Sequence, residues 1–329
     1  MLHLKKYNIM HDILTITLNP ALDKSTYTNR VQPERKIRCS TPYYEPGGGG
    51  INVSRAIKKL GGNSCAWFLS GGPSGEKLCS LLKEEGINFK AMKAKNWTRE
   101  NLMVMEENTG NQFRFGMPGP ETSEEEWKQC LEKLEEIPNK ELPKYVVASG
   151  SLPPGVPDDF YLQLAQMANR RGFRLIVDTS GDALLKAAGE GVYLLKPNQN
   201  EFAALVGKEE VSALEQEQIA VQILEEGKCK VLVVSLGPRG AMVASKEAGI
   251  SYIMTPPVKQ KSAVGAGDSM VGAMVMSLLK GNMNIDEVVR YGVAAGTAAT
   301  MTPGSELCKK EDTEKIYQWL LEHRELTNI

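Results

Sequence analysis

The chain has 329 residues, 42% of them hydrophobic, which is enough apolar material for a sizeable core in one large domain or two smaller ones. Its net charge of −1 and pI of about 6.4 give no sign of binding to nucleic acid or to an anionic membrane surface, and no apolar run approaches the ~18 residues of a membrane span. Six scattered cysteines without a C-x-x-C pair argue against a zinc site or a disulfide framework and suit the cytoplasm.

The three histidines, His3, His11 and His323, lie near the ends of the chain. A buried imidazole base or a histidine-ligated metal is therefore not expected in the middle of the chain. If the protein is an enzyme, its general base is expected to be Asp, Glu, Lys or Cys. Residues 1–12 do not resemble a secretory signal and are treated as an N-terminal extension.

The first predicted strand, Ile13–Leu18, ends at Asn19-Pro20, with Asp23 just beyond it. Ligands of open α/β sheets lie past the carboxyl ends of the strands, so Asp23 is a candidate for binding ligand hydroxyls. An ordinary turn aspartate after a proline explains the local sequence equally well.

Two stretches predict strands outside the main sheet, in a lid or at a dimer contact. Residues 27–44 are extended in character and carry Lys36. A lysine at this position fits a lid or dimer contact, and it also fits an ordinary solvated edge strand, where lysine is common. Residues 88–115 are similar, with a hairpin turn at 108–111. Arg99, within the second stretch, is either a bidentate ligand of a phosphate group or an ordinary surface arginine.

Four consecutive glycines, Gly47–Gly50, lead directly into a predicted helix that ends at Gly61-Gly62. Such a run costs backbone entropy and is useful where a ligand must approach the main chain at a helix N-terminus, with Asn52 as an added donor. A flexible linker is the alternative, but linkers are seldom followed at once by an amphipathic helix.

From residue 145 onward, predicted strands alternate with helices, which indicates a parallel sheet covered on both faces. Each strand ends in a polar or glycine-rich turn, where such sheets place their sites. After strand 193–195, Asn198 and Glu201 share a helix face and could hold Mg²⁺ through its waters, although a capping box has the same spacing. The small-residue helix 290–301 suits packing against a flat ligand such as adenine or within the core.

The segment Val264–Ser269 precedes an apolar run long enough for a buried helix, Met270–Leu279. Its glycines permit a tight turn, and the free amides of the helix N-terminus form an anion site. Asp268 stands at the rim of that site. Phosphoryl transfer uses this pairing, because the amides hold developing negative charge while the carboxylate takes a proton from the attacking hydroxyl. The alternatives are an N-cap at Asp268 and an ordinary glycine turn.

Together these motifs resemble those of the ribokinase-type, or PfkB, carbohydrate kinases. The glycine run with Asn52 resembles the N-terminal signature of that family, Val264–Asp268 its C-terminal signature, and Asn198-x-x-Glu201 its magnesium motif. The resemblance extends from about residue 13 to residue 321. Within the family, the chain is most similar to the bacterial ATP-dependent 6-phosphofructokinases of the isozyme-2 type.

The resemblance implies a fold, which is one ribokinase-like domain over residues 13–325. It contains a doubly wound, mostly parallel sheet with helices on both faces, and a small β-sheet lid from about 24–46 and 88–117. It also implies ATP-dependent phosphorylation of the 1-hydroxyl of fructose-6-phosphate. Tagatose-6-phosphate kinase and 1-phosphofructokinase are close alternatives, although their first glycine motif usually carries a lysine. A non-catalytic sugar-phosphate sensor is a further alternative, which the intact Gly265–Asp268 motif disfavours.

Roles at individual positions follow from the resemblance alone. Asp268 would be the base, and the amides of Gly265, Ala266 and Gly267 would stabilise the transferring phosphoryl group. The implied substrate-binding residues are Asp23, Lys36, Gly48, Gly49, Gly50, Asn52, Arg99 and Ser151, of which Lys36 could belong to a neighbouring subunit. The implied nucleotide-binding residues are Asn198, Ser235, Leu236, Gly237, Pro238, Arg239, Gly240, Gln260, Val293 and Thr297.

The implied cofactors are ATP, Mg²⁺ and K⁺. Asn198 and Glu201 would organise Mg²⁺, and the K⁺ ligands, mainly backbone carbonyls, would be Ser262, Val264, Ala299, Thr302, Gly304 and Glu306. Many relatives have an aspartate where Ser262 stands. Relatives also form dimers through the lid and can be inhibited by ATP, so a homodimer and an ATP-induced tetramer are expected.

Overall fold

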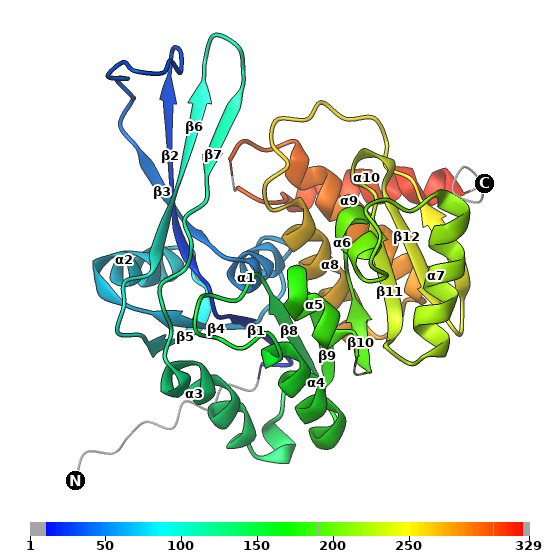
Figure 1. Ribbon diagram of the computed structural model, residues 1–329. Helices are drawn as coiled ribbons and strands as arrows, with labels where there is room; N and C mark the ends of the chain where they lie inside the picture. Colours follow the sequence, from blue (N-terminus) through cyan, green and yellow to red (C-terminus); the bar gives the residue numbers. More distant parts are fainter. Residues whose placement is uncertain (1–10, 190, 305, 325–329) are drawn as a thin grey trace.

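The main body of the protein is built on one nine-stranded sheet (Figure 1). The computed structural model describes residues 11–189, 191–304 and 306–324. The sheet order is β13-β12-β11-β10-β9-β8-β1-β4-β5, parallel from β5 to β11 and antiparallel at β12 and β13. The strands are β1 (Ile13–Thr17), β4 (Cys65–Ser70), β5 (Asn88–Lys93), β8 (Tyr145–Ser149), β9 (Arg174–Asp178), β10 (Val192–Leu195), β11 (Cys229–Ser235), β12 (Ala241–Ser245) and β13 (Gly249–Ile253).

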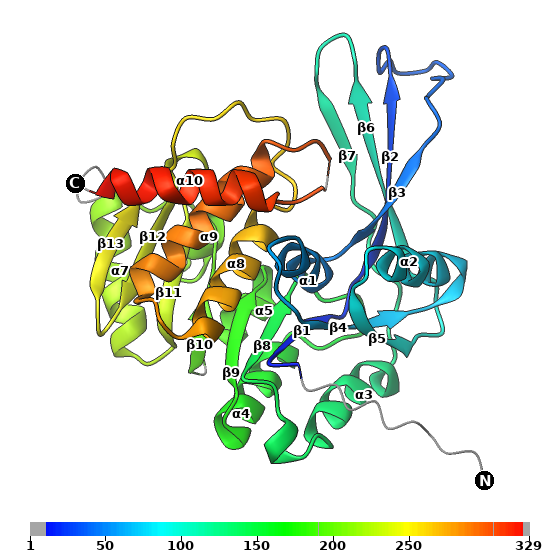
Figure 2. The same ribbon diagram turned by 180° about the vertical axis from the view of Figure 1, so that it is seen from behind.

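Helices cover both faces of this sheet, as Figures 1 and 2 show from opposite sides. One face carries α3 (Glu124–Glu135), α4 (Phe160–Arg171), α5 (Gly181–Ala187), α6 (Gln199–Ala204) and α7 (Ala213–Glu225). The other carries α1 (Gly49–Lys59), α2 (Gly72–Glu84), α8 (Ala266–Lys280), α9 (Ile285–Thr300) and α10 (Lys310–Glu322). The predicted doubly wound architecture is confirmed.

Successive residues of a buried strand supply two different cores. In β8, Val146 and Ala148 pack with α3 to α7, whereas Tyr145 and Val147 pack with α1, α8, α9 and α10. This alternation follows from the two-residue side-chain period of a strand, and it explains why the parallel strands read as continuous apolar runs. A third, smaller core lies between α1, α2 and β4.

A separate four-stranded sheet, with order β3-β2-β6-β7, stands away from the main body as a lid (Figure 1). Its strands are β2 (Ala21–Thr28), β3 (Tyr43–Gly47), β6 (Arg99–Glu106) and β7 (Gln112–Phe115). Strands β6 and β7 pair antiparallel across residues 107–111, so the predicted hairpin is confirmed.

Two predictions about the lid are wrong. Strand β5 was expected in the lid but pairs with β4 at the edge of the main sheet. Its alternating polar pattern is typical of any edge strand, and only its partner decides which sheet it joins. Residues 27–44 were expected to be strands broken by Pro33 and Pro42, but residues 29–42 form a loop throughout, because the two prolines remove backbone donors. Glu106 accepts a hydrogen bond from the Val31 amide at 2.8 Å and holds this loop to β6.

All six cysteines are free thiols, as the sequence predicted. No helix among the described residues combines the length and the apolar character that crossing a membrane requires.

Candidate functional site

Asp268 is the third residue of α8, on the first turn of the helix. The N-cap is Gly265, at φ +72°, and no side chain caps this helix end, so the alternative of Asp268 as an N-cap is wrong. A Cβ on Gly265 would lie 2.3 Å from Leu307 Cδ2, in addition to the strain of a positive φ. The tight turn therefore requires glycine at this position.

The environment of Asp268 gives its carboxylate the properties of a base. Asn52 Nδ2 donates a hydrogen bond to Asp268 Oδ2 at 3.0 Å. Burial, and then the nearby charge of Asp178, raise the pKa of Asp268 to about 7. A carboxylate with a pKa near the working pH is suited to general-base catalysis.

Lys196, at the end of β10, adds a positive charge to the anion site. Its ammonium is 5% exposed and lies 3.0 Å from Asp178 Oδ1. A Cβ on Gly267 would lie 3.5 Å from Lys196 Nζ, so the ammonium faces the first turn of α8. The sequence analysis did not assign Lys196 to the site. The only signal was a lysine at the carboxyl end of a buried strand, where such sheets bind ligands.

Asn198 and Glu201 form a capping box at the start of α6. Glu201 N donates to Asn198 Oδ1 at 2.9 Å, and Asn198 N donates to Glu201 Oε2 at 2.8 Å, which confirms the capping alternative. Burial raises the pKa of Glu201, and the charges of Asp178 and Lys196 are close enough to affect it.

Asn198 and Glu201 fit Mg²⁺ only indirectly. Among residues 11–189, 191–304 and 306–324, no three His, Cys, Asp or Glu side chains lie close enough together to bind a metal ion themselves. Mg²⁺ keeps several of its waters and is bound largely through substrate phosphates. Asn198 and Glu201 follow Lys196 in the chain, at the start of α6, and suit that indirect mode of binding.

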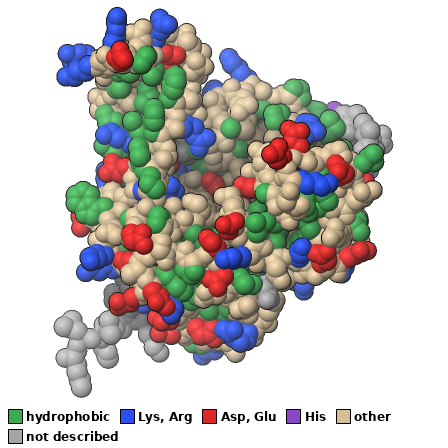
Figure 3. Space-filling model, viewed as in Figure 1, with side chains coloured by type: hydrophobic (Ala, Val, Ile, Leu, Met, Phe, Trp, Pro, Cys, Tyr) green, Lys and Arg blue, Asp and Glu red, His purple; other side chains and the backbone are tan. Residues whose placement is uncertain are grey.

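A cavity of about 380 Å³ lies between the lid and the loop before α8, where Figure 3 shows the surface hollowed. Asp23, Asn101, Arg114 and Val264 are among its lining residues. Asn101 Nδ2 donates to Asp23 Oδ1 at 2.8 Å, while burial raises the pKa of Asp23. The sequence analysis found Asp23 but missed Asn101 and Arg114, because strand pairing alone brings β2, β6 and β7 together.

Arg99 and Ser151 are brought together through Asn19. Arg99 Nη2 donates to the Asn19 carbonyl at 3.1 Å, and Asn19 Nδ2 lies 3.2 Å from Ser151 Oγ. Asn19 is buried, and the sequence analysis did not assign it to the site. Since a guanidinium and a hydroxyl are typical phosphate ligands, this end of the site suits a phosphate group.

Lys36 lies elsewhere. It belongs to the loop at the outer end of the lid and lines a different cavity, of about 560 Å³. Arg30, Arg35 and Arg38 line the same cavity, and Figure 3 shows Lys and Arg side chains gathered at the tip of the lid. The folded chain therefore does not bring its own Lys36 to Asp23, Arg99 or Ser151.

The glycine run is packed against protein atoms. A Cβ on Gly47 would lie 2.4 Å from Asp23 Oδ2, one on Gly49 2.3 Å from Ser149 Oγ, and one on Gly50 2.6 Å from Thr17 Oγ1. Gly48, the N-cap of α1, has φ +110°. The absence of side chains on these glycines therefore lets α1 pack closely against the ends of β1, β2 and β8. This packing reason for the glycine run was not predicted from the sequence.

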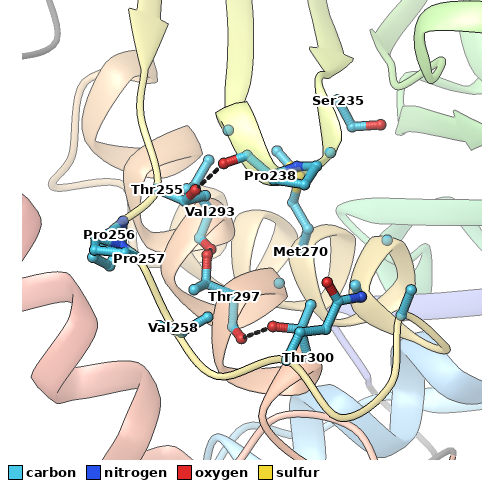
Figure 4. A pocket seen from close by; sticks show the side chains of 17 residues that line it. Ser235, Pro238, Thr255, Pro256, Pro257, Val258, Met270, Val293, Thr297 and Thr300 are labelled. Carbon is cyan, nitrogen blue, oxygen red and sulfur yellow. Dashed lines mark hydrogen bonds between the residues drawn. The ribbon is translucent and has the colours of Figure 1, made fainter. Parts of the chain in front are cut away.

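A second cavity, of about 590 Å³, lies between the β11–β12 turn and helices α8 and α9 (Figure 4). Thr255, Pro256 and Pro257 cover one side of it, and Val293 and Thr297 line it from α9. The predicted nucleotide residues that line it are Ser235, Gly237, Pro238, Gly240, Gln260, Val293 and Thr297. Leu236 belongs to the core instead, and Arg239 is not among the lining residues.

The six positions expected to bind K⁺ lie on two adjoining segments, 262–264 and 299–306. The amide of Ser262 donates to the Thr300 carbonyl at 3.2 Å, which joins the segments. Thr302 Oγ1 donates to the Ala299 carbonyl at 2.8 Å. Gly304, at φ +57°, lies near the lid residue Tyr43. The expected K⁺ positions therefore lie on two segments that contact each other, one of which leads directly into the first turn of α8.

Comparisons with known proteins agree with this geometry. The family model of pfkB family carbohydrate kinases matches residues 5–312. ATP-dependent 6-phosphofructokinase isozyme 2 of Escherichia coli (strain K12) is 48% identical over 309 residues, which cover 94% of this chain and 98% of that protein. Structures of phosphofructokinase-2 from Escherichia coli, one in complex with potassium and one in a tetrameric inhibited form, match with TM-scores of 0.88 and 0.87 at 46% and 47% identity. Each structural match covers 94% of this chain and 99% of the other. The chain therefore belongs to the pfkB family of carbohydrate kinases.

Proposed function

We propose that this protein is an ATP-dependent 6-phosphofructokinase, which transfers the γ-phosphoryl group of ATP to the 1-hydroxyl of fructose-6-phosphate. One observation carries the proposal. Val264 lines the cavity beneath the lid, whereas Ala266 and Gly267 line the cavity beside α9. The two cavities thus meet at a single turn of chain, and Asp268 follows that turn directly.

The proposed mechanism uses this meeting point. Asp268 accepts the proton of the 1-hydroxyl as its oxygen attacks the γ-phosphorus, and ADP leaves on the opposite side. The amides of Gly265, Ala266 and Gly267, with the Lys196 ammonium, stabilise the charge that spreads over the phosphoryl oxygens. Asp23 binds sugar hydroxyls, and Arg99 and Ser151 bind the 6-phosphate.

The cofactor assignments are proposals on the same basis. Mg²⁺ would neutralise charge on the phosphates of ATP, with Asn198 and Glu201 holding its waters. K⁺ would lie behind the anion turn, between residues 262–264 and 299–306. The structure of phosphofructokinase-2 from Escherichia coli in complex with potassium supports the K⁺ assignment.

We further propose a homodimer formed through the lid, which ATP can convert to a tetramer. Lys36 lies in a cavity separate from Asp23 and Arg99, so it can act on a sugar phosphate only from a neighbouring subunit. Phe115 on β7 is 46% exposed, which leaves apolar surface on the lid for a partner. A tetrameric form is described for the Escherichia coli relative.

Mixing two impaired variants tests the action of Lys36 across subunits. Lys36→Ala and Asp268→Asn homodimers are each expected to turn over slowly. A hybrid has one site with an intact base and the Lys36 of the other subunit, so activity should return on mixing and exchange. If no activity returns while co-purification of differently tagged subunits shows that hybrids form, Lys36 does not act across the interface.

The function itself is tested by ADP release from the purified protein with Mg²⁺ and ATP. Fructose-6-phosphate, tagatose-6-phosphate, fructose-1-phosphate and ribose are compared, with and without K⁺. A clear preference for fructose-6-phosphate is expected. A preference for fructose-1-phosphate or ribose would keep the base and the anion site but would contradict the roles of Arg99 and Ser151. A preference for tagatose-6-phosphate would contradict only the assignment of the sugar. Absence of turnover with all four would contradict the proposed function.

A further inference from the structure

Arg55, on α1, is a buried arginine that the proposed mechanism does not use. Its side chain is 3% exposed, yet it lies one helical turn from Asn52, the residue that contacts Asp268. A guanidinium is rarely buried unless each of its donors is paired, so its partners indicate what it holds in place.

Three elements meet at Arg55. Its Nε and Nη2 donate to the two carboxylate oxygens of Glu85, the C-cap of α2, each at 2.8 Å. Its Nη1 donates to the carbonyl of Pro46 on lid strand β3 at 2.9 Å and to Asn52 Oδ1 at 3.2 Å. Glu45, also on β3, lies 3.7 Å from Nη2.

The contact with Asn52 fixes the orientation of that amide. A guanidinium has donors and no acceptor, so the Asn52 atom that faces Arg55 must be the oxygen. The amide nitrogen is then directed at Asp268, to which it donates at 3.0 Å. With Arg55 removed, the Asn52 amide could rotate by 180° and present its oxygen to the Asp268 carboxylate, which would be repulsive.

The contact with β3 extends the same link to the lid. Pro46 is paired with Leu22, and Glu45 with Asp23, in the register of β3 and β2. The base of the lid, which carries Asp23, is thus held to the helix that carries Asn52. Arg55 therefore lies between the two carboxylates that would bind the sugar and take its proton.

We propose that Arg55 is a positioning residue for phosphoryl transfer, which orients Asn52 toward Asp268 and holds the lid strand β3 against α1. The proposal rests on the proposed kinase function. Arg55 contacts neither cavity, so its effect reaches the reacting atoms through Asn52 and through the position of Asp23. Misplacing a reacting group by about 1 Å can cost about 10²-fold in rate.

The test is a double-mutant cycle on kcat with Arg55→Met, Asn52→Ala and the double variant. Arg55→Met is expected to lower kcat about 10- to 100-fold, with the KM for ATP unchanged, since no residue of α1 lines the nucleotide cavity. The double variant should lose less than the product of the two single losses, because both changes remove the link through Asn52, whereas only Arg55→Met also frees β3. Multiplied losses, or an unchanged kcat in Arg55→Met, would overturn the proposal.

Arg171→Met is the matched control. Arg171 on α4 is likewise a mostly buried arginine, with 12% of its side chain exposed, and it donates to the carbonyls of Glu135 and Ile137. It lines neither cavity, so this variant should lose stability and keep kcat. If Arg55→Met and Arg171→Met lose stability equally and neither loses kcat, Arg55 is structural.

Arg55→Lys keeps the proposal testable if Arg55→Met does not fold. A lysine keeps the charge opposite Glu85 but cannot also reach Pro46 and Asn52, so stability should be retained and kcat lowered. A soluble Arg55→Lys protein with full kcat would overturn the proposal. Wild-type turnover is measured first. Its absence would contradict the kinase function rather than the role of Arg55.

Discussion

Helices α1 and α8 both begin at glycine-rich turns, and their first turns meet where Asn52 contacts Asp268. Their surroundings differ. A Cβ on Gly49 would lie within 2.8 Å of Ser149 Oγ and the Gly150 amide, whereas one on Gly267 would meet only Lys196 within 4 Å. Protein atoms fill the space beside the first turn of α1, and a cavity lies beside the first turn of α8.

A glycine run thus indicates that something approaches the backbone closely, but it does not distinguish neighbouring protein atoms from a ligand. At α1 the glycines let the helix approach the ends of β1 and β8, so that Asn52 can reach Asp268. At α8 they leave amides and a positive helix end facing a cavity, with the buried Lys196 ammonium beside them. The first helix is therefore expected to govern stability and the position of the site, and the second to govern chemistry.

Replacing the base gives the largest expected effect. Asp268→Asn should lower kcat about 10²- to 10⁴-fold, because no proton acceptor of similar geometry remains. ADP release at saturating substrates measures the loss, and thermal unfolding checks that the variant folds. A variant with near wild-type turnover would remove Asp268 from the mechanism.

Lys196→Met is expected to have the next largest effect, about 10²-fold on kcat, since it removes one positive group from the anion site. It should also lower stability, because Asp178 loses its ion-pair partner in a buried setting. The double variant Lys196→Met/Asp178→Asn should recover stability and leave kcat low. Recovery of kcat as well would mean that Lys196 acts only by neutralising Asp178.

A pair of glycine substitutions addresses the two helix starts directly. Gly49→Ala should destabilise the protein by about 1–3 kcal/mol, because its Cβ overlaps Ser149. Gly267→Ala should leave the melting temperature unchanged or slightly raised, since alanine favours helix, and should lower kcat by placing a methyl group in the anion site. Equal losses of stability in both variants would remove the distinction between the two helices.

The pH dependence of the wild type is expected to be the smallest effect. The pKa of Asp268 is raised to about 7, and the base must be deprotonated, so kcat should fall as the pH drops below about 7. For stability the sign is opposite, because a raised folded-state pKa of an acid means that ionisation opposes folding. The free energy of unfolding therefore decreases as the pH rises from 3.8, the pKa of the carboxyl in the unfolded chain, to about 7, its pKa in the folded protein.

Asp268→Asn provides the control for that pH effect. The variant should be more stable than the wild type at pH 8, and the difference should disappear at low pH. Melting temperatures of both proteins between pH 4 and pH 8 measure it. A constant difference across that range would show that the carboxylate does not titrate as its burial requires.

Much of the fold could be predicted from local pattern. Apolar runs such as Val231–Val234 and polar turns at their carboxyl ends indicated a parallel sheet with helices on both faces. The spacing of the glycine run, Asn198-x-x-Glu201 and Val264–Asp268 indicated the site. Each of these features is formed by residues within one turn or one strand of each other, so a short stretch of sequence is enough to predict it.

The elements that were mispredicted depend on a distant partner. Strand β5 has a polar, alternating pattern that fits either sheet, and pairing with β4 places it in the main one. Residues 29–42 have extended character but no partner strand in the described structure, so they form a loop. Local preference is weaker than the hydrogen bonds and burial that a neighbouring strand supplies.

The sequence by itself determined the α/β class and the glycine-rich turn at a helix start, and it predicted Asp268 as the base, because helix N-termini and strand ends are made by consecutive residues. Only the tertiary structure decided what surrounds them. It placed the Lys196 ammonium beside Gly267, packed the glycine run against β1, β2 and β8, and joined Arg55, Asn52 and Asp268 across two helices. Contacts between residues so far apart in the chain arise from packing the whole core, which no local pattern encodes.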